Sequence, residues 1–246
     1  MTLPTSRGRW LALGLALALH PLARAGDEAP IELDGLDAYR GPTGAWAVVG
    51  GVHLDPENPR RLAADPGTGV IYNGPAGRTT NLVTRQAFGD VEASLEFLVP
   101  KGSNSGVKFA GRYELQIFDS HGKKTIDGGD NGGIYPRAEL LPFYHHLDAG
   151  TPPRVNASRA PGEWQTLEVS FRAPRFDAGG KKTANARFVK VLLNGQVVHE
   201  DVEVASPTGH AWHTKETPTG PLFLQADHGP VAFRKIRLRP SEAKRD

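Results

Sequence analysis

The sequence predicts an all-β domain in which two antiparallel sheets pack as a sandwich or a barrel. Glycine and proline, 29 and 20 residues respectively, interrupt the 246-residue chain at short intervals. The segments between them are short and rich in β-branched and aromatic residues, which is the composition of strands. No long segment has the 3.6-residue hydrophobic period of a helix. Many short strands separated by frequent turns are typical of sandwiches and barrels.

The strand pattern recurs along the whole chain. The segments that carry it are 46–49, 70–72, 81–84, 90–99, 106–109, 113–118, 165–172, 187–193, 196–200, 222–225 and 231–238. Over 90–99, hydrophobic residues alternate with Glu92, Ser94 and Glu96, so the two kinds occupy opposite faces of a strand. The pair Asn194-Gly195 lies between hydrophobic runs and predicts a type I′ hairpin turn, because both central positions need positive φ.

The first 25 residues have the pattern of an export signal. Arg7 and Arg9 precede a hydrophobic stretch over 10–19, and Ala23-Arg24-Ala25 has the small-x-small form of a cleavage site. The stretch is shorter than the roughly 20 residues that a membrane span needs. We expect a cleaved signal peptide over 1–25, a single domain over 26–240 and a charged tail over 241–246. The mature protein is then periplasmic or secreted, without a stable membrane anchor.

Charge and cysteine content narrow the class of protein. The chain has 29 Lys and Arg against 27 Asp and Glu, but residues 1–25 hold three of the bases and no acid. The mature domain is therefore almost neutral, which argues against a nucleic-acid partner. The chain has no cysteine, so its fold contains no disulfide. A domain of this length can bury a sizeable core without one.

Polar residues in the segment 104–120 favour a binding cleft. Residues two apart on a strand share a face, so Glu114 and Gln116 project together, and we expect Lys108 and Arg112 to do the same. Acids, an amide and bases on adjacent strands suit a polar cleft better than a core. The alternative is a solvated outer face of an antiparallel sheet, and Asn104 and Ser105 could equally be turn residues.

Two stretches break the strand rhythm. The segment 119–153 is rich in Gly, His and Pro, and the segment 209–221 is a second long connection. Long connections in compact domains often bind ligands or act as lids. Tyr135 in the first segment is a candidate ligand residue, and His228 beside Gln225 at a strand end is another.

Several motifs, in this order, resemble one known family. They are Phe88-Gly89-Asp90-Val91-Glu92, Pro100-Lys101-Gly102-Ser103-Asn104-Ser105-Gly106-Val107, Tyr113-Glu114-Leu115-Gln116-Ile117-Phe118-Asp119, Gly133-Ile134-Tyr135, Pro161-Gly162-Glu163-Trp164-Gln165, Asn194-Gly195-Gln196-Val197-Val198-His199, Gly220-Pro221-Leu222-Phe223-Leu224-Gln225, His228-Gly229 and Val231-Ala232-Phe233-Arg234-Lys235-Ile236. The set resembles the DUF1080 family, also called the 3-keto-disaccharide hydrolase domain, over nearly all of the mature chain. The resemblance implies a concanavalin A-like jelly roll, two packed antiparallel sheets with a cleft on the concave one. It also implies an exported bacterial enzyme that hydrolyses 3-keto-glycosides or 3-keto-disaccharides, or that eliminates and hydrates them.

Cleavage of such a substrate requires particular side chains. A ketone at C3 acidifies the C2 hydrogen, so a base can remove it and the enolate can expel the group at C1. The reaction needs a general base, a group that polarises the C3 carbonyl, and an acid for the leaving oxygen. The candidate catalytic residues are Glu114, Asp119 and His228. The candidate substrate-binding residues are Asn104, Ser105, Lys108, Arg112, Gln116, Tyr135 and Gln225.

Two other functions use the same residues. Glu114, Gln116 and Asp119 have the spacing of the Glu-x-Asp-x-x-Glu motif of laminarinase-like retaining β-glucanases, in which a bulge can bring the last acid onto the face of the first two. Here an amide replaces the middle acid and a shorter Asp the last one. The third alternative is a carbohydrate-binding module without catalysis.

Cofactor motifs are sparse. No Gly-rich loop joins a strand to a helix to hold a phosphate, so we expect a separate sugar 3-dehydrogenase to oxidise the carbohydrate substrate. We predict no metal ligand set; the pattern leaves a bound divalent cation open.

Overall fold

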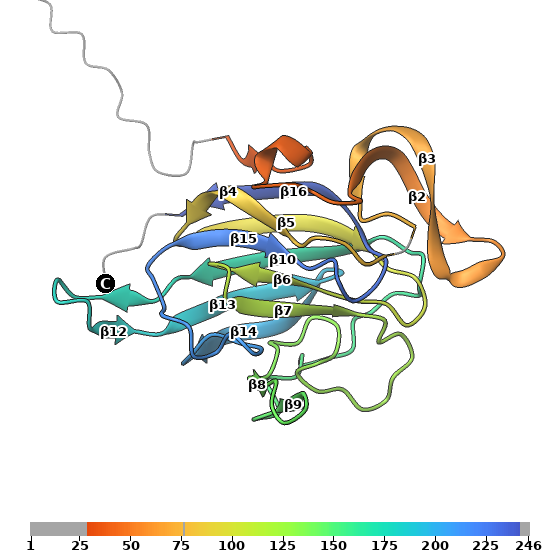
Figure 1. Cartoon of the computed structure of the whole chain (residues 1–246). Coiled ribbons are helices and arrows are strands. Elements are labelled where there is room, and N and C mark those ends of the chain that lie inside the picture. Colours follow the sequence, from red (N-terminus) through yellow and green to blue (C-terminus); the bar gives the residue numbers. More distant parts are fainter. Residues whose placement is uncertain (1–28, 76, 242–246) are drawn as a thin grey trace, which may run out of the picture.

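The computed structural model describes residues 29–75 and 77–241. The predicted signal peptide, and the predicted tail apart from Ser241, lie outside these residues. The chain forms two large antiparallel sheets that face each other (Figure 1). Its only helical element among the described residues is the short 3₁₀ helix η1 (Leu36–Ala38). No helix in this part of the chain is long and apolar enough to cross a membrane.

The larger sheet has eight strands. Its order is β14 (Gln196–Val204), β13 (Ala186–Leu193), β10 (Gln165–Arg172), β5 (Val91–Leu98), β16 (Ala232–Pro240), β3 (Asn58–Tyr72) and β2 (Ala47–Asp55), and β1 (Ile31–Glu32) also pairs with β16. Strands β2 and β3 continue beyond the sheet as a long hairpin that curls away from the body (Figure 1).

The smaller sheet has four strands and carries most of the predicted site. Its order is β4 (Leu82–Phe88), β15 (Gly220–Leu224), β6 (Asn104–Phe109) and β7 (Tyr113–Phe118). Two short ladders lie outside both sheets. They are β8 (Ala138–Glu139) with β9 (His145–His146), and β11 (Arg175–Phe176) with β12 (Lys182–Ala184).

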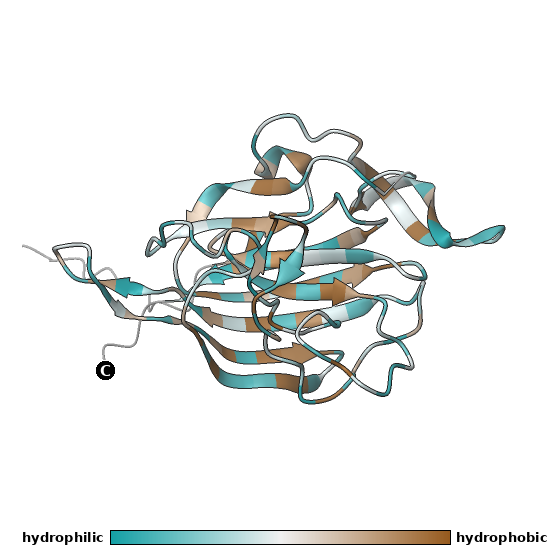
Figure 2. Cartoon of the chain, turned by 60° about the horizontal axis from the view of Figure 1, so that its bottom comes forward, coloured by the Kyte–Doolittle hydropathy of each residue, from teal (hydrophilic) through white to brown (hydrophobic). Residues whose placement is uncertain are grey.

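The core lies between the two sheets, where buried hydrophobic residues of both pack together (Figure 2). Phe109 of the smaller sheet packs against Phe171 and Phe188 of the larger one, with ring centroids 5.3 and 5.7 Å away. The predicted alternation in β5 is correct, since Val91, Ala93, Leu95 and Phe97 are all buried. The remaining face of each sheet is free to carry polar groups.

The predicted strands are all present, and two agree in both bounds, 113–118 and 165–172. The largest difference is β3, which begins at Asn58 and not at residue 70. Most residues of its first part are exposed, and backbone pairing with β2 holds them extended. The hairpin predicted at Asn194-Gly195 joins β13 to β14, and both residues have positive φ, 52° and 77°.

Candidate functional site

A polar pocket of about 320 Å³ opens on the outer face of the smaller sheet. Strands β6, β7 and β15 form its floor, and the segments 135–144 and 209–210 form part of its wall. Seven of the predicted site residues line it: Asn104, Lys108, Glu114, Gln116, Tyr135, Gln225 and His228. Their roles stay predictions, but the fold brings their side chains to one place.

The β6–β7 hairpin places a cation and an anion together on the pocket floor. Lys108 pairs with Glu114 across the two strands, so their side chains leave the same face. The Lys108 Nζ lies 3.0 Å from Glu114 Oε2, and the two side chains are only 14% and 3% exposed. Lys108 also lies over the Phe223 ring of β15, 5.3 Å from its centroid. These contacts hold both charges on the pocket floor, where the two side chains are largely shielded from solvent.

Gly106 makes room for the Glu114 carboxylate. A Cβ built on Gly106 would lie 2.3 Å from Glu114 Oε1, well inside the contact distance. On the same face, Gln116 Nε2 donates a hydrogen bond to Asn104 Oδ1 at 3.1 Å. Each of these amides has a second polar atom with which it can bind a hydroxyl group.

Tyr135 reaches the pocket because its segment pairs with the edge of β7. Gly132 donates to the Gln116 carbonyl at 2.8 Å, Gln116 donates to the Gly133 carbonyl at 2.8 Å, and Tyr135 donates to the Glu114 carbonyl at 3.1 Å. Its phenol is 2.8 Å from the Tyr144 hydroxyl. Burial, this hydrogen bond and the charge of Glu114 raise the pKa of Tyr135, so it is a neutral phenol.

His228 lines the pocket from the segment that follows β15. Its Nδ1 lies 2.6 Å from Asp227 Oδ1. A carboxylate accepts hydrogen bonds, so Nδ1 carries a proton and Nε2 is the ring atom left for proton exchange. Burial alone would raise the pKa of Asp227, but the hydrogen bond and charge of His228 lower it overall. Asp227 is therefore the ionised partner that orients this imidazole.

Comparison with family models assigns the chain to a known group. Residues 36–239 match the 3-keto-alpha-glucoside-1,2-lyase-like domain. The chain belongs to this family. The match spans almost all of the described residues, and it agrees with the predicted family and with the two-sheet jelly roll.

Solved structures similar to this lyase-like domain include three candidate glycosyl hydrolases from Parabacteroides distasonis. The one solved at 2.13 Å is 25% identical, with a TM-score of 0.60, and the match covers 86% of this chain and 83% of that one. The one solved at 1.70 Å is 16% identical, with a TM-score of 0.49 and coverage of 80% and 89%. The third is 19% identical, with a TM-score of 0.48 and coverage of 79% and 98%. No curated protein matches the chain.

Two predicted site residues of the lyase-like domain lie elsewhere. Ser105 follows Asn104 directly and so points to the opposite face, where it is buried and donates to the Gln225 carbonyl at 2.8 Å. Asp119 lies beyond the end of β7, and its carboxylate accepts a hydrogen bond from the Gly102 amide at 2.9 Å. Strand β7 pairs regularly with β6, without the bulge that would bring Asp119 to the face of Glu114.

Arg112 also lies outside the pocket of the lyase-like domain, so the prediction that it shares a face with Lys108 is wrong. A tight turn separates the two residues, with positive φ at Ala110 and Gly111, 49° and 66°. Arg112 belongs to this turn, and its guanidinium donates to the Ala110 carbonyl at 2.9 Å. The period-2 rule holds within one strand and fails across the turn.

Other pocket residues of the lyase-like domain were not predicted from the sequence. They are Asn81, Tyr144, Gly209, His210, Phe223 and Asp227. Asp227 could have been found from its position beside His228. The residues of the two long connections, Tyr144 and His210, had only the general signal that such connections often bind ligands.

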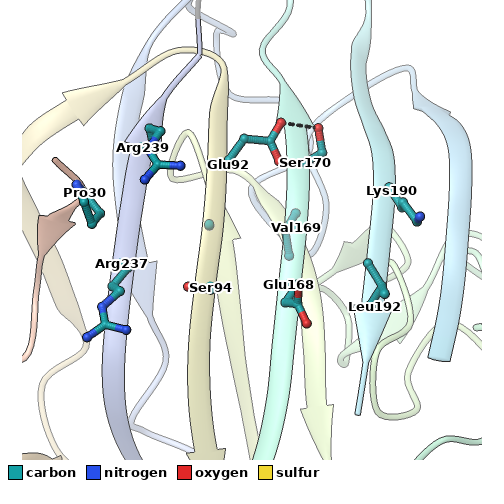
Figure 3. Close-up of a pocket in the computed structure, with 11 residues that line it drawn as sticks. Pro30, Glu92, Ser94, Glu168, Val169, Ser170, Lys190, Leu192, Arg237 and Arg239 are labelled. Atoms are coloured by element: carbon teal, nitrogen blue, oxygen red, sulfur yellow. Dashed lines mark hydrogen bonds between the residues drawn. The ribbon is translucent and has the colours of Figure 1, made fainter. Parts of the chain in front are cut away.

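A second hollow, of about 290 Å³, lies on the outer face of the larger sheet (Figure 3). Acidic and basic side chains line it in rows along the strands, as on a solvated sheet face. Ser170 donates to Glu92 at 2.6 Å, and Arg237 pairs with Glu32 at 2.8 Å. Among residues 29–75 and 77–241, no group of three His, Cys, Asp or Glu side chains could hold a metal ion.

Proposed function

We propose that this protein cleaves 3-keto-glucosides by eliminating the C1 substituent across C1–C2, with water addition completing net hydrolysis. Family membership supports a carbohydrate-active enzyme. One observation carries the specific reaction: the Lys108 ammonium and the Glu114 carboxylate lie 3.0 Å apart on the floor of the polar pocket.

That spacing suits a substrate with a ketone at C3. The acidic hydrogen on C2 and the carbonyl oxygen on C3 belong to neighbouring carbons, so a base and a cation must stand side by side. Glu114 takes the C2 proton, and the electron pair of the C2–H bond moves onto the C3 oxygen. The Lys108 ammonium neutralises the enolate that forms. A charge aimed at developing charge in a pocket with little water is among the largest contributions to catalysis.

Collapse of the enolate breaks the bond between C1 and its substituent. The C3 carbonyl re-forms, C1 and C2 become doubly bonded, and the electron pair of the broken bond leaves on the glycosidic oxygen. His228 in its doubly protonated form gives that oxygen a proton from Nε2 and keeps the proton on Nδ1, which Asp227 accepts as a hydrogen bond. Addition of water across C1–C2, with hydroxide at C1 and a proton at C2, yields the free 3-keto sugar.

The remaining lining residues suit the sugar itself. Asn104, Gln116 and Gln225 are amides that can both donate to and accept from hydroxyl groups. The neutral Tyr135 phenol lines the same pocket as Glu114 and can form hydrogen bonds with the substituents of the sugar ring. A pocket of this volume accommodates a small ligand.

The retaining-glucanase alternative loses its second carboxylate. Retention needs two carboxyl groups about 5–5.5 Å apart that flank the scissile bond. The predicted partner, Asp119, is engaged with the Gly102 amide beyond the end of β7. Elimination beside a ketone needs only one carboxylate as a base, which Glu114 supplies.

Two further features belong to the proposal. The sequence of this chain has no Gly-rich phosphate-binding loop for a redox cofactor. A separate redox enzyme therefore introduces the ketone by oxidising the C3 hydroxyl. The pattern of residues 1–25 supports export, so the substrate is met in the periplasm or outside the cell.

One assay tests the reaction. The purified protein is incubated with methyl glucoside and with its 3-keto derivative, in both anomeric forms, and methanol release is followed. We expect release from the keto compound only, and in deuterated water we expect deuterium at C2 of the product. Release from the plain glucoside would favour a glucanase, and binding without release would favour a carbohydrate-binding module.

A further inference from the structure

An exposed hydrophobic loop borders the candidate site. The strands β8 and β9 are joined by the residues Leu140-Leu141-Pro142-Phe143-Tyr144. Leu140, Leu141, Phe143 and Tyr144 are 54, 80, 70 and 49% exposed. Hairpin tips are normally polar, and exposed apolar groups this close together usually mark a contact surface.

The base of this loop is firmly held. Arg137 is paired with Asp148, with 2.7 Å between Nε and Oδ2, and its guanidinium lies 5.5 Å from the centre of the Trp212 ring. Trp212 in turn donates to Glu139 at 3.2 Å. The backbone amide of Ala138 donates to the Gly209 carbonyl at 3.1 Å. The hydrophobic tip therefore stands at a defined place, joined to the segment that carries His210.

The tip separates two hollows that share His210. On one side Tyr144 lines the candidate site together with Lys108 and Glu114. On the other side lies a hollow of about 440 Å³, which is lined by Leu140, Leu141 and Ala211 together with Glu139, His210, His213 and Thr214. His210 lines both hollows, so the second hollow adjoins the candidate site.

We propose that the second hollow binds the C1 substituent of the substrate and that this substituent is an apolar or aromatic group. This inference rests on the proposed function. A second sugar would present hydroxyl groups to Leu140 and Leu141, whereas an aromatic ring would bury their exposed surface. The chain therefore prefers 3-keto-glucosides of apolar alcohols to those of small polar ones.

The test compares the benzyl and methyl 3-keto-glucosides. Benzyl alcohol and methanol leave with similar ease, so a difference in kcat/KM reports binding of the aromatic ring. We expect the wild-type protein to prefer the benzyl compound by roughly tenfold or more, because even one buried methylene group gives a discrimination of this size. Leu141→Ser should reduce the preference to near one and leave kcat/KM for the methyl compound unchanged. Leu141 is 80% exposed, so the variant should fold, which circular dichroism checks.

Val155→Ser is the matched control, because Val155 is also exposed, at 42%, and lines neither hollow. It should keep the benzyl preference. Equal rates for the two keto-glucosides in the wild type, or an unchanged preference in Leu141→Ser, would overturn the inference while leaving the proposed function intact. The inference would also be overturned if sedimentation showed that the wild type is a dimer and that the only effect of Leu141→Ser is to dissociate it. If neither keto-glucoside is cleaved, the proposed function itself fails.

Discussion

The Glu114 carboxylate occupies the space that a side chain at Gly106 would need. A Cβ at this position would come within 2.3 Å of Glu114 Oε1, and Gly106 has no positive φ that would call for glycine on other grounds. Glycine at position 106 is therefore needed to leave space for the Glu114 carboxylate.

Gly106→Ala should lower kcat/KM on a 3-keto-glucoside by about 100-fold, because a shift of about 1 Å in a catalytic group costs that much. The free energy of unfolding should change little, since the side chain of Glu114 can move toward the pocket. Gly89→Ala is the control, with its nearest contact at an ordinary 3.4 Å. Equal losses in both variants would show that the effect is not local to the carboxylate.

The Lys108–Glu114 pair should separate activity from stability. Glu114→Gln keeps a hydrogen-bond acceptor for Lys108, so we expect a folded protein whose kcat is reduced about 10²–10⁴-fold, the usual contribution of a general base. Lys108→Met leaves the 3%-exposed carboxylate without its cation and should destabilise the fold by about 3–5 kcal/mol.

The double variant Lys108→Met/Glu114→Gln should recover most of that stability and none of the activity. Urea unfolding and methanol release from the keto-glucoside measure the two quantities. A wild-type rate in Glu114→Gln would remove Glu114 from the mechanism.

The strand pattern of the chain predicts most of the fold and part of the site. Hydrophobic alternation is a local property, and 113–118 and 165–172 therefore agree in both bounds with β7 and β10. The first part of β3 has no such alternation and contains Pro59 and Pro66, and only its pairing with β2 makes it a strand. Local patterns also fail for the side-chain directions of Ser105 and Arg112. The direction of Ser105 depends on where β6 begins, and that of Arg112 depends on the turn between β6 and β7. Tyr144 and His210 come from long connections whose paths depend on tertiary contacts.

Asp227 should matter for the leaving-group step. Asp227→Asn replaces the charged acceptor of the His228 Nδ1 proton by a neutral amide, which holds that proton and the ring less firmly. We expect kcat to fall about 10²-fold or more for the methyl compound. A substrate with a much more acidic alcohol at C1 should lose less, because its oxygen leaves without a proton. An equal loss on both substrates would contradict the role of His228 as the acid.

His199 should make the fold sensitive to acid. The residue is buried, and its Nε2 donates to the Gly132 carbonyl at 2.7 Å, which supports the segment that carries Tyr135. Burial lowers the pKa of His199 below its usual value of 6.5. The unfolded chain therefore binds a proton that the folded one resists, and stability falls as the pH drops below about 6.5, by at most about 1.4 kcal/mol per pH unit.

Urea unfolding between pH 7.5 and 5 measures this slope. His199→Gln can keep a donor for Gly132 and should flatten the slope. His53→Gln is the comparison variant, because it replaces a histidine whose side chain is 54% exposed. A slope that is the same in the wild type and in His199→Gln would assign the acid sensitivity to other groups.

The pairing of residues 132–135 with β7 has a consequence for solubility. Strand β7 is the last strand of the smaller sheet, and this segment occupies the backbone groups on its outer edge. An uncovered edge strand recruits strands from other molecules. Changes that detach the segment therefore do more than misplace Tyr135: they uncover a template for aggregation. Selection for a soluble protein and selection for an intact pocket act here on the same four residues.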